Sequence, residues 1–134
     1  MSEENVEFVR RVFAATKRGL EDGEVSTVVR DFYDREGQYE PVEEAKPLRG
    51  HDQIVDYFRR WLTVWDDFRV ELEEVIDAGD QVVSVARSGG RAKASGVEVS
   101  QRIYSVIDVR NDKIFRNREF LDRREALEAA GLSE

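Results

Sequence analysis

The chain has 134 residues, of which 40% are hydrophobic and 10% aromatic, enough for one domain with one core. Its formal net charge of −8 argues against a general affinity for nucleic acid or for an anionic membrane. The chain has no cysteine, which excludes disulfides, thiolate catalysis and cysteine-ligated metals, and its apolar runs are too short to cross a membrane. The acidic start MSEENVEF lacks the features of a secretory signal, so we expect a cytoplasmic protein.

The first half of the chain reads as three helices with one short strand between them. Apolar residues at helical spacing predict helices over residues 3–18 and 24–33, and a third from Asp52 to about Trp65 with an unusually aromatic face. Residues 38–44 predict a short strand. Because proline cannot donate to a ladder, Pro41 places this strand at a sheet edge or ends it there. Residues 46–50 are expected to form a loop.

The second half of the chain reads as an antiparallel meander. Alternation predicts strands over residues 68–77, 81–93, 97–110 and 113–121, and Asn111-Asp112 is a two-residue hairpin signal. A closing helix follows, with Asp122 as its N-cap and Gly131 at its end. The order of elements predicts an α+β fold in which helices cover one face of the sheet.

Charge and alternation are unusual in the last two strands. Eight basic residues lie between positions 87 and 118 against three acidic ones, which favours a solvated outer sheet face over an anion-binding patch. In the last strand Asn117 and Glu119 share a phase with Phe115 and Leu121, whereas a core strand would keep polar residues off that face.

This order of elements, with LRGHDQIVDYFRRW, the AGD turn and the closing NDKIFRNREFLDRREALEAAGL, resembles the SnoaL-like branch of the nuclear transport factor 2-like superfamily over essentially the whole chain. The resemblance implies a single domain, residues 1–134, folded as a cone-shaped α+β barrel. In such a fold a curved antiparallel sheet with a mixed edge wraps around three N-terminal helices and encloses a cone-shaped apolar pocket, and a short C-terminal helix follows. It also implies a homodimer. Members include ketosteroid isomerases, polyketide cyclases, epoxide hydrolases and non-catalytic binders.

A pocket of this kind needs a few convergent polar groups on an apolar wall. On this interpretation Asn117 and Glu119 point inward, between Phe115 and Leu121, while Arg116 and Arg118 lie outside. The neighbouring strand has the same mostly apolar phase, and the helices supply aromatic walls. The predicted ligand-binding residues are Phe13, Phe58, Trp61, Trp65, Gln101, Ile103, Ser105 and Asn117.

Glu119 and Glu40 are the candidate catalytic residues. A carboxyl group in an apolar cavity has a raised pKa and can move protons near neutral pH; the alternative is that Glu119 pairs with an arginine or Gln101 and merely tolerates burial. The resemblance places Glu40 at the position of the ketosteroid isomerase base; the alternative is an exposed Glu40 beside Pro41. The two oxyanion donors of those enzymes fall on Phe13, which cannot donate, and on Ser105.

The remaining family chemistries fit less well. The single histidine, His51, is expected to be exposed, and the Arg-x-Asp motif of the epoxide hydrolases is absent, because Tyr104 follows Arg102. We therefore expect either a cofactor-independent acid–base enzyme of the isomerase or cyclase type acting on a small apolar carbonyl compound, or a non-catalytic binder of a small hydrophobic ligand, or a dimeric scaffold with a vestigial pocket. We expect no metal site, no cofactor, no nucleic-acid partner and no membrane partner.

Overall fold

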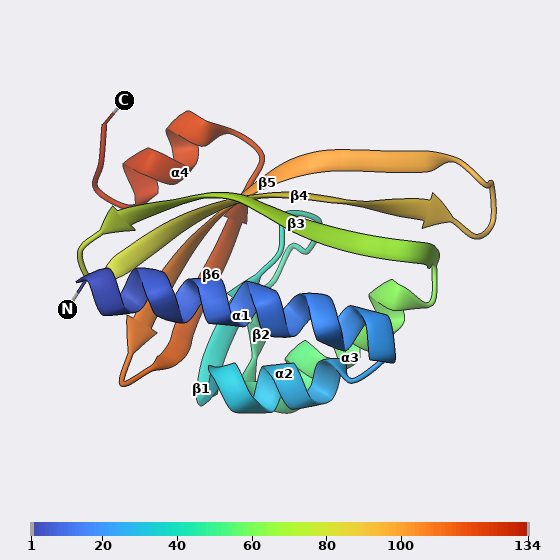
Figure 1. The fold of residues 1–134 in the computed structure, drawn as a ribbon, viewed down its shortest axis with the longest axis horizontal. Coiled ribbons are helices and arrows are strands. Elements are labelled where there is room, and N and C mark those ends of the chain that lie inside the picture. The colour runs from blue at the N-terminus through green and yellow to red at the C-terminus, as the bar shows by residue number, and fades with distance from the viewer. Residues whose placement is uncertain (1, 134) are drawn as a thin grey trace.

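The computed structural model describes residues 2–133, in which a curved sheet packs across a layer of helices (Figure 1). The helices are α1 (Ser2–Asp22), α2 (Val25–Phe32), α3 (Gly50–Leu62) and α4 (Arg123–Ala129). The strands are β1 (Tyr33–Glu40), β2 (Leu48–Arg49), β3 (Trp65–Ala78), β4 (Gln81–Ala92), β5 (Glu98–Arg110) and β6 (Lys113–Phe120). The predicted α+β class is confirmed.

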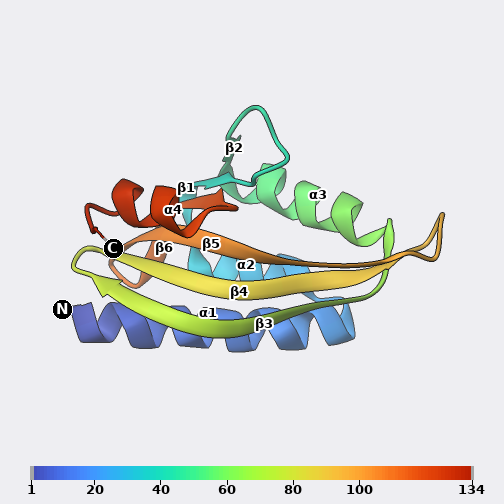
Figure 2. The same ribbon diagram turned by 90° about the horizontal axis from the view of Figure 1, so that it is seen from above.

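The sheet has the strand order β2-β1-β6-β5-β4-β3 and remains open. The strands β3 to β6 form the predicted antiparallel meander, and β1 runs parallel to β6, which makes the sheet mixed. Figure 2 shows β3, β4 and β5 curving together across the molecule, with α1 beside β3 and α3 toward β1. The predicted curved sheet with a mixed edge is confirmed, and it does not close into a barrel, because β2 and β3 are edges that do not meet.

Several element boundaries differ from the predictions. The strand β1 begins at Tyr33 rather than at residue 38, and it ends at Glu40, directly before Pro41. The segment expected as a loop contributes β2, which takes the edge position beside β1. Helix α3 ends at Leu62, where the Thr63 hydroxyl donates to the Arg60 carbonyl oxygen at 2.6 Å, so Trp65 opens β3 instead of closing the helix.

The predicted turn and cap residues adopt the conformations that their sequence signals require. Asn111 and Asp112 have φ angles of 51° and 57°, the left-handed pair of a tight hairpin between β5 and β6. The Asp122 side chain accepts a hydrogen bond from the backbone N–H of Arg124 at 2.9 Å and so caps α4. Gly131, with φ of 78°, follows the end of that helix.

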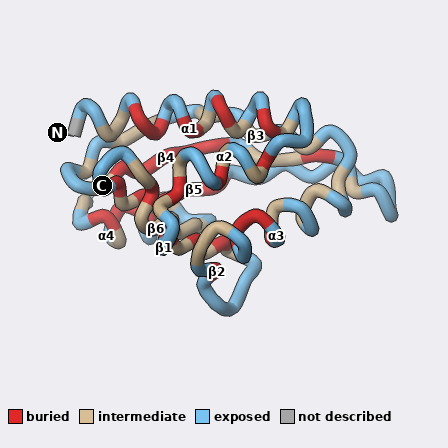
Figure 3. The backbone as a smooth tube through the Cα atoms, turned by 90° about the horizontal axis from the view of Figure 1, so that it is seen from below, coloured by how far each residue is buried: buried red, intermediate tan, exposed pale blue. Residues whose placement is uncertain are grey.

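The core lies on both faces of the sheet. On the concave face, α1, α2 and α3 pack against the inward side chains of the sheet. The buried residues of this layer include Phe8 and Val9 of α1, Ile54 of α3, Ile107 of β5 and Ile114 of β6. In Figure 3 the buried stretches of these helices and strands are coloured red. The helix α4 packs on the opposite face, with Ala126, Leu127 and Ala130 against Val83 and Val106. The order of elements predicted helices on one face of the sheet only. This prediction is wrong for α4, which covers part of the other face.

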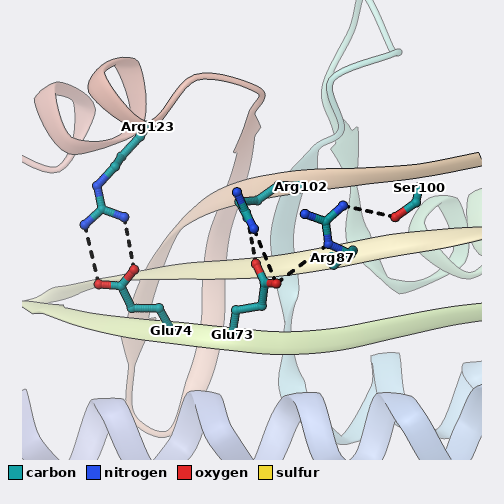
Figure 4. Close-up of polar contacts among 6 residues, drawn as sticks. All are labelled: Glu73, Glu74, Arg87, Ser100, Arg102 and Arg123. Carbon is teal, nitrogen blue, oxygen red and sulfur yellow. Dashed lines mark hydrogen bonds and ion pairs between the residues drawn. The ribbon is translucent and has the colours of Figure 1, made fainter.

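The rest of the outer sheet face carries exposed ion pairs (Figure 4). Glu73 of β3 contacts Arg102 at 2.7 Å and Arg87 at 3.7 Å. Glu74 contacts Arg123 at 3.0 Å. The long basic side chains of β4 and β5 thus lie across an acidic strand in contact with water, as expected for a solvated face, where solvent screening leaves each ion pair little effect on stability. Within residues 2–133 no helix combines the length and apolarity needed to cross a membrane.

Candidate functional site

A cavity of about 150 Å³ lies between the concave face of the sheet and helices α1, α2 and α3. Aromatic side chains make up much of its wall: Phe13, Tyr33, Tyr39, Tyr57, Phe58, Trp61 and Phe68. Its polar uncharged members are Thr16, Ser88, Gln101, Ser105 and Asn117. The charged members are both acidic, Glu43 and Glu119. The wall therefore combines an apolar surface with a few polar groups, the composition expected of a small-molecule site.

A β-bulge in β6 decides which of its side chains face the cavity. Val109 pairs with Ile114 but Asp108 pairs with Arg116, so Phe115 is the extra residue. Ile114 consequently faces the cavity, and the Phe115 ring lies outside, with the Arg110 guanidinium carbon 4.0 Å from its centroid. The inward positions of Asn117 and Glu119 are confirmed. The predicted inward position of Phe115 is wrong because of the bulge.

Glu119 is held by two hydrogen bonds. The Tyr39 hydroxyl donates to Oε2 at 2.5 Å, and the backbone N–H of Val42 donates to Oε1 at 3.3 Å. Burial raises the pKa of Glu119 to about 7, the hydrogen bond from Tyr39 opposes this rise, and the charge of Glu43 adds to it. The predicted alternative, in which Glu119 is paired with an arginine or with Gln101, is wrong, since Tyr39 and Val42 take those places.

Asn117 and Tyr33 form a second polar pair in the wall. The Asn117 side-chain amide donates to the Tyr33 hydroxyl at 3.0 Å, and its Oδ1 is buried with no partner among residues 2–133. Burial raises the pKa values of both Tyr33 and Tyr39 above the ordinary value of 10.0. Both phenols are therefore protonated hydrogen-bond donors at neutral pH. The Tyr33 oxygen accepts from Asn117, which leaves its own proton for another acceptor.

Glu40 lies on the opposite face of β1 from the cavity. Its carboxylate pairs with Arg116 at 2.7 Å and accepts from Gln38 at 2.6 Å. Burial alone would raise the pKa of Glu40, but the hydrogen bonds from Arg116 and Gln38 outweigh it and hold the pKa below its usual value. Of the two predicted alternatives, the place in the pocket is wrong, because side chains alternate along a strand and Tyr39 takes the inward place; Glu40 lies outside, as the other alternative has it, but it is paired and partly buried.

The other predicted wall residues divide into those that line the cavity and one that does not. Phe13, Phe58, Trp61, Gln101, Ile103 and Ser105 all line it. Trp65 does not, because it begins β3 rather than continuing α3; its ring packs behind Trp61, with the centroids 5.4 Å apart. His51, expected to be exposed, is half-buried, and its Nε2 lies 2.8 Å from the Tyr33 carbonyl oxygen.

Sequence reasoning missed the tyrosines. The helix predicted over residues 24–33 ends at Tyr33. The strand predicted over residues 38–44 contains Tyr39 but leaves out the first half of β1, which begins at Tyr33. The alternation around Tyr39 and Glu40 was the available signal, because it separates the two side chains onto opposite faces. In the structure Tyr39 also begins an aromatic series, with ring centroids 5.4 Å from Phe58 and 5.6 Å from Tyr57.

Comparison with known proteins decides the family. Residues 9–117 match the family model of the SnoaL-like domain. The chain belongs to the SnoaL-like family. A search of curated proteins finds no significant match.

Solved structures with the same SnoaL-like fold cover nearly the whole chain. A candidate SnoaL-like polyketide cyclase from Jannaschia sp. CCS1 is 21% identical, covers 99% of this chain and 95% of its own, and superposes with a TM-score of 0.77. A ketosteroid isomerase-like protein from Catenulispora acidiphila, in complex with trimethylamine, is 18% identical, with coverage of 90% and 92% and a TM-score of 0.72. An NTF2-like protein from Burkholderia thailandensis is 24% identical, with coverage of 87% and 89% and a TM-score of 0.73. At these identities the likeness establishes the fold alone.

The cavity of this SnoaL-like domain therefore carries a titratable group and separate donors. Glu119 exchanges a proton near pH 7, whereas Tyr33 and Tyr39 keep theirs. Among residues 2–133 no group of three histidine or acidic side chains is placed to hold a metal ion. The polar groups described above can move a proton and stabilise an oxygen that gains negative charge.

Proposed function

We propose that this SnoaL-like protein binds a small, largely apolar carbonyl compound and that Glu119 transfers a proton at the carbon next to the carbonyl. The observation that carries the proposal is Glu119 itself, whose carboxyl group lines the cavity, is held by Tyr39 and Val42, and has a pKa raised to about 7. A general base is most effective when its pKa lies near the working pH, since it is then both available and basic enough. At neutral pH about half of the Glu119 groups are ionised.

Each polar neighbour has a separate role in the proposed step. The Tyr39 hydroxyl orients the carboxylate through the 2.5 Å hydrogen bond. Ionised Glu119 removes the proton, the electron pair of the broken C–H bond forms a C=C bond to the carbonyl carbon, and the π pair of the C=O bond moves onto the oxygen. The Tyr33 hydroxyl, positioned by Asn117, and the Ser105 hydroxyl donate to that oxygen. Protonated Glu119 then returns the proton to the same carbon or to another one, which regenerates the base.

Hydrogen exchange tests this proposal without knowledge of the natural substrate. Acetophenone has a benzene-sized ring and exchangeable methyl protons, so we expect the protein to catalyse their replacement by deuterium in D₂O, followed by NMR. The rate should rise with pH to a plateau above about 7, because the ionised carboxylate is the base. Glu119→Gln should lower it at least about 100-fold. Glu40→Gln removes a carboxylate outside the cavity and should leave it unchanged.

A non-catalytic binder is the second candidate function. Both oxygens of Glu119 already accept hydrogen bonds, from Tyr39 and Val42, which favours a carboxyl group held in place over one that moves. Quenching of Trp61 fluorescence by acetophenone separates the two functions. Binding without exchange would reject the catalytic role and leave the binder, whereas exchange at an equal rate in Glu119→Gln would assign the catalysis to another group.

We also propose a homodimer, which the family resemblance supports. The outer face of β3, β4 and β5 is covered by α4 at one end only, and its exposed ion pairs are available to a second copy (Figure 4). Light scattering after size exclusion should give twice the mass of one chain. A single-chain mass over the working concentration range would contradict the proposal.

A further inference from the structure

The inward side of β5 continues beyond the cavity as a partly exposed apolar surface. Along this side the exposed fraction rises from 2% at Ile107 and 6% at Ser105 to 7% at Ile103. Gln101, next along, lines the cavity and is exposed, and the two residues beyond it, Val99 and Val97, are 38% and 56% exposed. The cavity therefore reaches the surface at Gln101, two residues from Val99 along β5.

The opposite side of the same segment is charged. Arg91 of β4 contacts Glu98 of β5 at 3.4 Å, and Arg87 donates to the Ser100 hydroxyl at 3.1 Å. This end of β4 and β5 projects from the body of the molecule (Figure 1), and Figure 3 shows its backbone as exposed. The segment thus alternates apolar and polar residues as a half-buried strand does, although Val99 and Val97 on its apolar side stay 38% and 56% exposed.

Exposed large apolar residues gather at this end of the molecule. Those within residues 2–133 are Val64, Val97, Val99 and Leu121, and the backbone segments of the first three are neighbours. The Val64 carbonyl oxygen accepts from the backbone N–H of Lys93 at 3.0 Å, and the Val97 carbonyl oxygen accepts from Ala92 at 2.9 Å. Exposed apolar residues that continue from a cavity wall are a candidate binding surface.

The size of the cavity indicates what such a surface would hold. At about 150 Å³ it has room for a benzene-sized group, whereas sites that enclose whole ligands measure about 300 to 1,000 Å³. A larger ligand must therefore leave through the mouth. Six residues separate Ser105, opposite Glu119, from Val99, which corresponds to about 20 Å along an extended strand.

We propose that Val97 and Val99, termed the outer valines, bind the apolar chain of a ligand whose carbonyl-bearing head occupies the cavity. This inference rests on the proposed function and deepens it, because it defines the ligand class as carbonyl compounds with a long alkyl or similarly apolar tail. The occupant is a ligand chain because the outer valines continue the same side of β5 as Ser105, Ile103 and Gln101 in the cavity wall.

A series of para-alkyl acetophenones tests the outer valines through chain length. The probes are acetophenone and its para-butyl, para-octyl and para-dodecyl derivatives, and Trp61 fluorescence reports their binding. Each methylene of the alkyl chain that contacts the protein buries about half of its surface, so each one should raise the affinity of the wild type about twofold. In Val97→Ser/Val99→Ser the para-dodecyl compound should bind about tenfold more weakly. Acetophenone and the para-butyl compound, which end before Val99, should bind as in the wild type.

Leu121→Ser is the matched control, since Leu121 is 58% exposed and does not line the cavity. It should leave the affinities of the whole series unchanged, and thermal melting should confirm that both variants are folded.

An equal loss of affinity for all four compounds, or the same chain-length dependence in wild type and double variant, would overturn the role of the outer valines while the proposed binding of the head in the cavity stands. If acetophenone itself fails to bind the wild type, the proposed function fails with it. If the double variant loses a dimer seen by light scattering and keeps the chain-length dependence, the outer valines contact a second copy instead.

Discussion

Glu40 and Glu119 show how the face of a strand determines the chemistry of a carboxyl group. They lie on the paired strands β1 and β6, where Glu40 pairs with Arg118, the residue before Glu119. The side chain of Glu40 points away from the cavity, and that of Glu119 points into it. Arg116 and Gln38 hydrogen-bond the first and lower its pKa, whereas burial among aromatic rings raises the pKa of the second to about 7. The same residue type is thus part of an ion pair on one face and a carboxyl group with a raised pKa on the other.

Tyr39 and Glu43 should shift the pKa of Glu119 in opposite directions. The hydrogen bond from Tyr39 favours the carboxylate, so Tyr39→Phe should raise the pKa of Glu119 above about 7. The negative charge of Glu43 favours the neutral acid, so Glu43→Gln should lower it. The pH dependence of acetophenone exchange, or a ¹³C NMR titration of the carboxyl carbon, measures both shifts. A profile that is identical in the two variants would remove Tyr39 and Glu43 as the groups that set this pKa.

The raised pKa of Glu119 should also make the stability of the fold depend on pH. The folded value of about 7 exceeds the ordinary 4.5, so this group favours the folded state most below pH 4.5, and that contribution is lost as the pH rises through 7. The loss amounts to about 3 kcal/mol. Glu119→Gln cannot ionise. Its free energy of unfolding, relative to that of the wild type, should therefore increase by about that amount between pH 4.5 and pH 8 in urea titrations.

Glu40→Gln is the control of opposite sign. The pKa of Glu40 is lowered, so its stabilising contribution is present above its ordinary pKa and is lost as the pH falls. Because the side chains of Glu40 and Arg116 are 27% and 41% exposed, solvent screening limits the effect to less than about 1 kcal/mol. The Glu40→Gln variant should be slightly less stable than the wild type at neutral pH. If the difference in free energy of unfolding between Glu119→Gln and the wild type does not change with pH, Glu119 does not have a raised pKa in the folded protein.

At the scale of elements, two glycines allow the long strands to bend over the cavity. A Cβ atom on Gly89 would overlap the Val99 carbonyl oxygen, and one on Gly90 would lie 3.1 Å from the Asp66 carbonyl oxygen. The strand β3 has a bulge at the same level, between Asp66 and Arg69. Three strands therefore approach more closely here than side chains permit, which is the usual use of glycine inside a strand.

Gly89→Ala should destabilise the fold more than a glycine substitution at the tip of the same hairpin. The new methyl group meets backbone atoms that cannot move aside without breaking the β4–β5 pairing, which should cost at least about 2 kcal/mol. Gly96 has φ of 74° and open space around it, so Gly96→Ala should cost about 1 kcal/mol from backbone strain alone. Urea denaturation of both variants measures the difference. Equal costs would show that the close approach at Gly89 relaxes freely.

The sequence predicts elements governed by local signals and misses features set by pairing. Asn111-Asp112 and the Asp122 cap are local, and the structure has both where they were expected. The bulge at Phe115 depends on how β6 meets β5, so alternation alone assigned that residue to the wrong face. The same reason explains Trp65: helical spacing continues to it from Trp61, but pairing with Ala92 of β4 places it in a strand. The inward turn of Asn117 and Glu119 was predictable, whereas their partners Tyr33 and Tyr39 come from a strand whose start was misplaced.

At the scale of the whole molecule, charge is separated between the outside and the cavity. The outer face balances Glu73 and Glu74 with arginines, so its field is weak. The cavity wall contains Glu43 and Glu119 and no basic side chain, within a chain of net charge −8. A negative ligand would meet only negative charge there, in surroundings that screen it poorly. The cavity should therefore select against anions.

Benzoate and benzamide test this selection, because they have nearly the same shape and differ in charge. At pH 8, where Glu119 is mostly ionised, benzoate should bind at least tenfold more weakly than benzamide in a Trp61 fluorescence titration. The difference should shrink in Glu43→Gln and again in Glu43→Gln/Glu119→Gln, and it should persist in Glu40→Gln, whose charge lies on the other face. Added salt should reduce the difference only in part, because it screens the exposed Glu43 but reaches Glu119 in the partly enclosed cavity less well. If benzoate binds as well as benzamide, a cation must compensate the two carboxyl groups, and the acidic wall would then not determine which ligands enter.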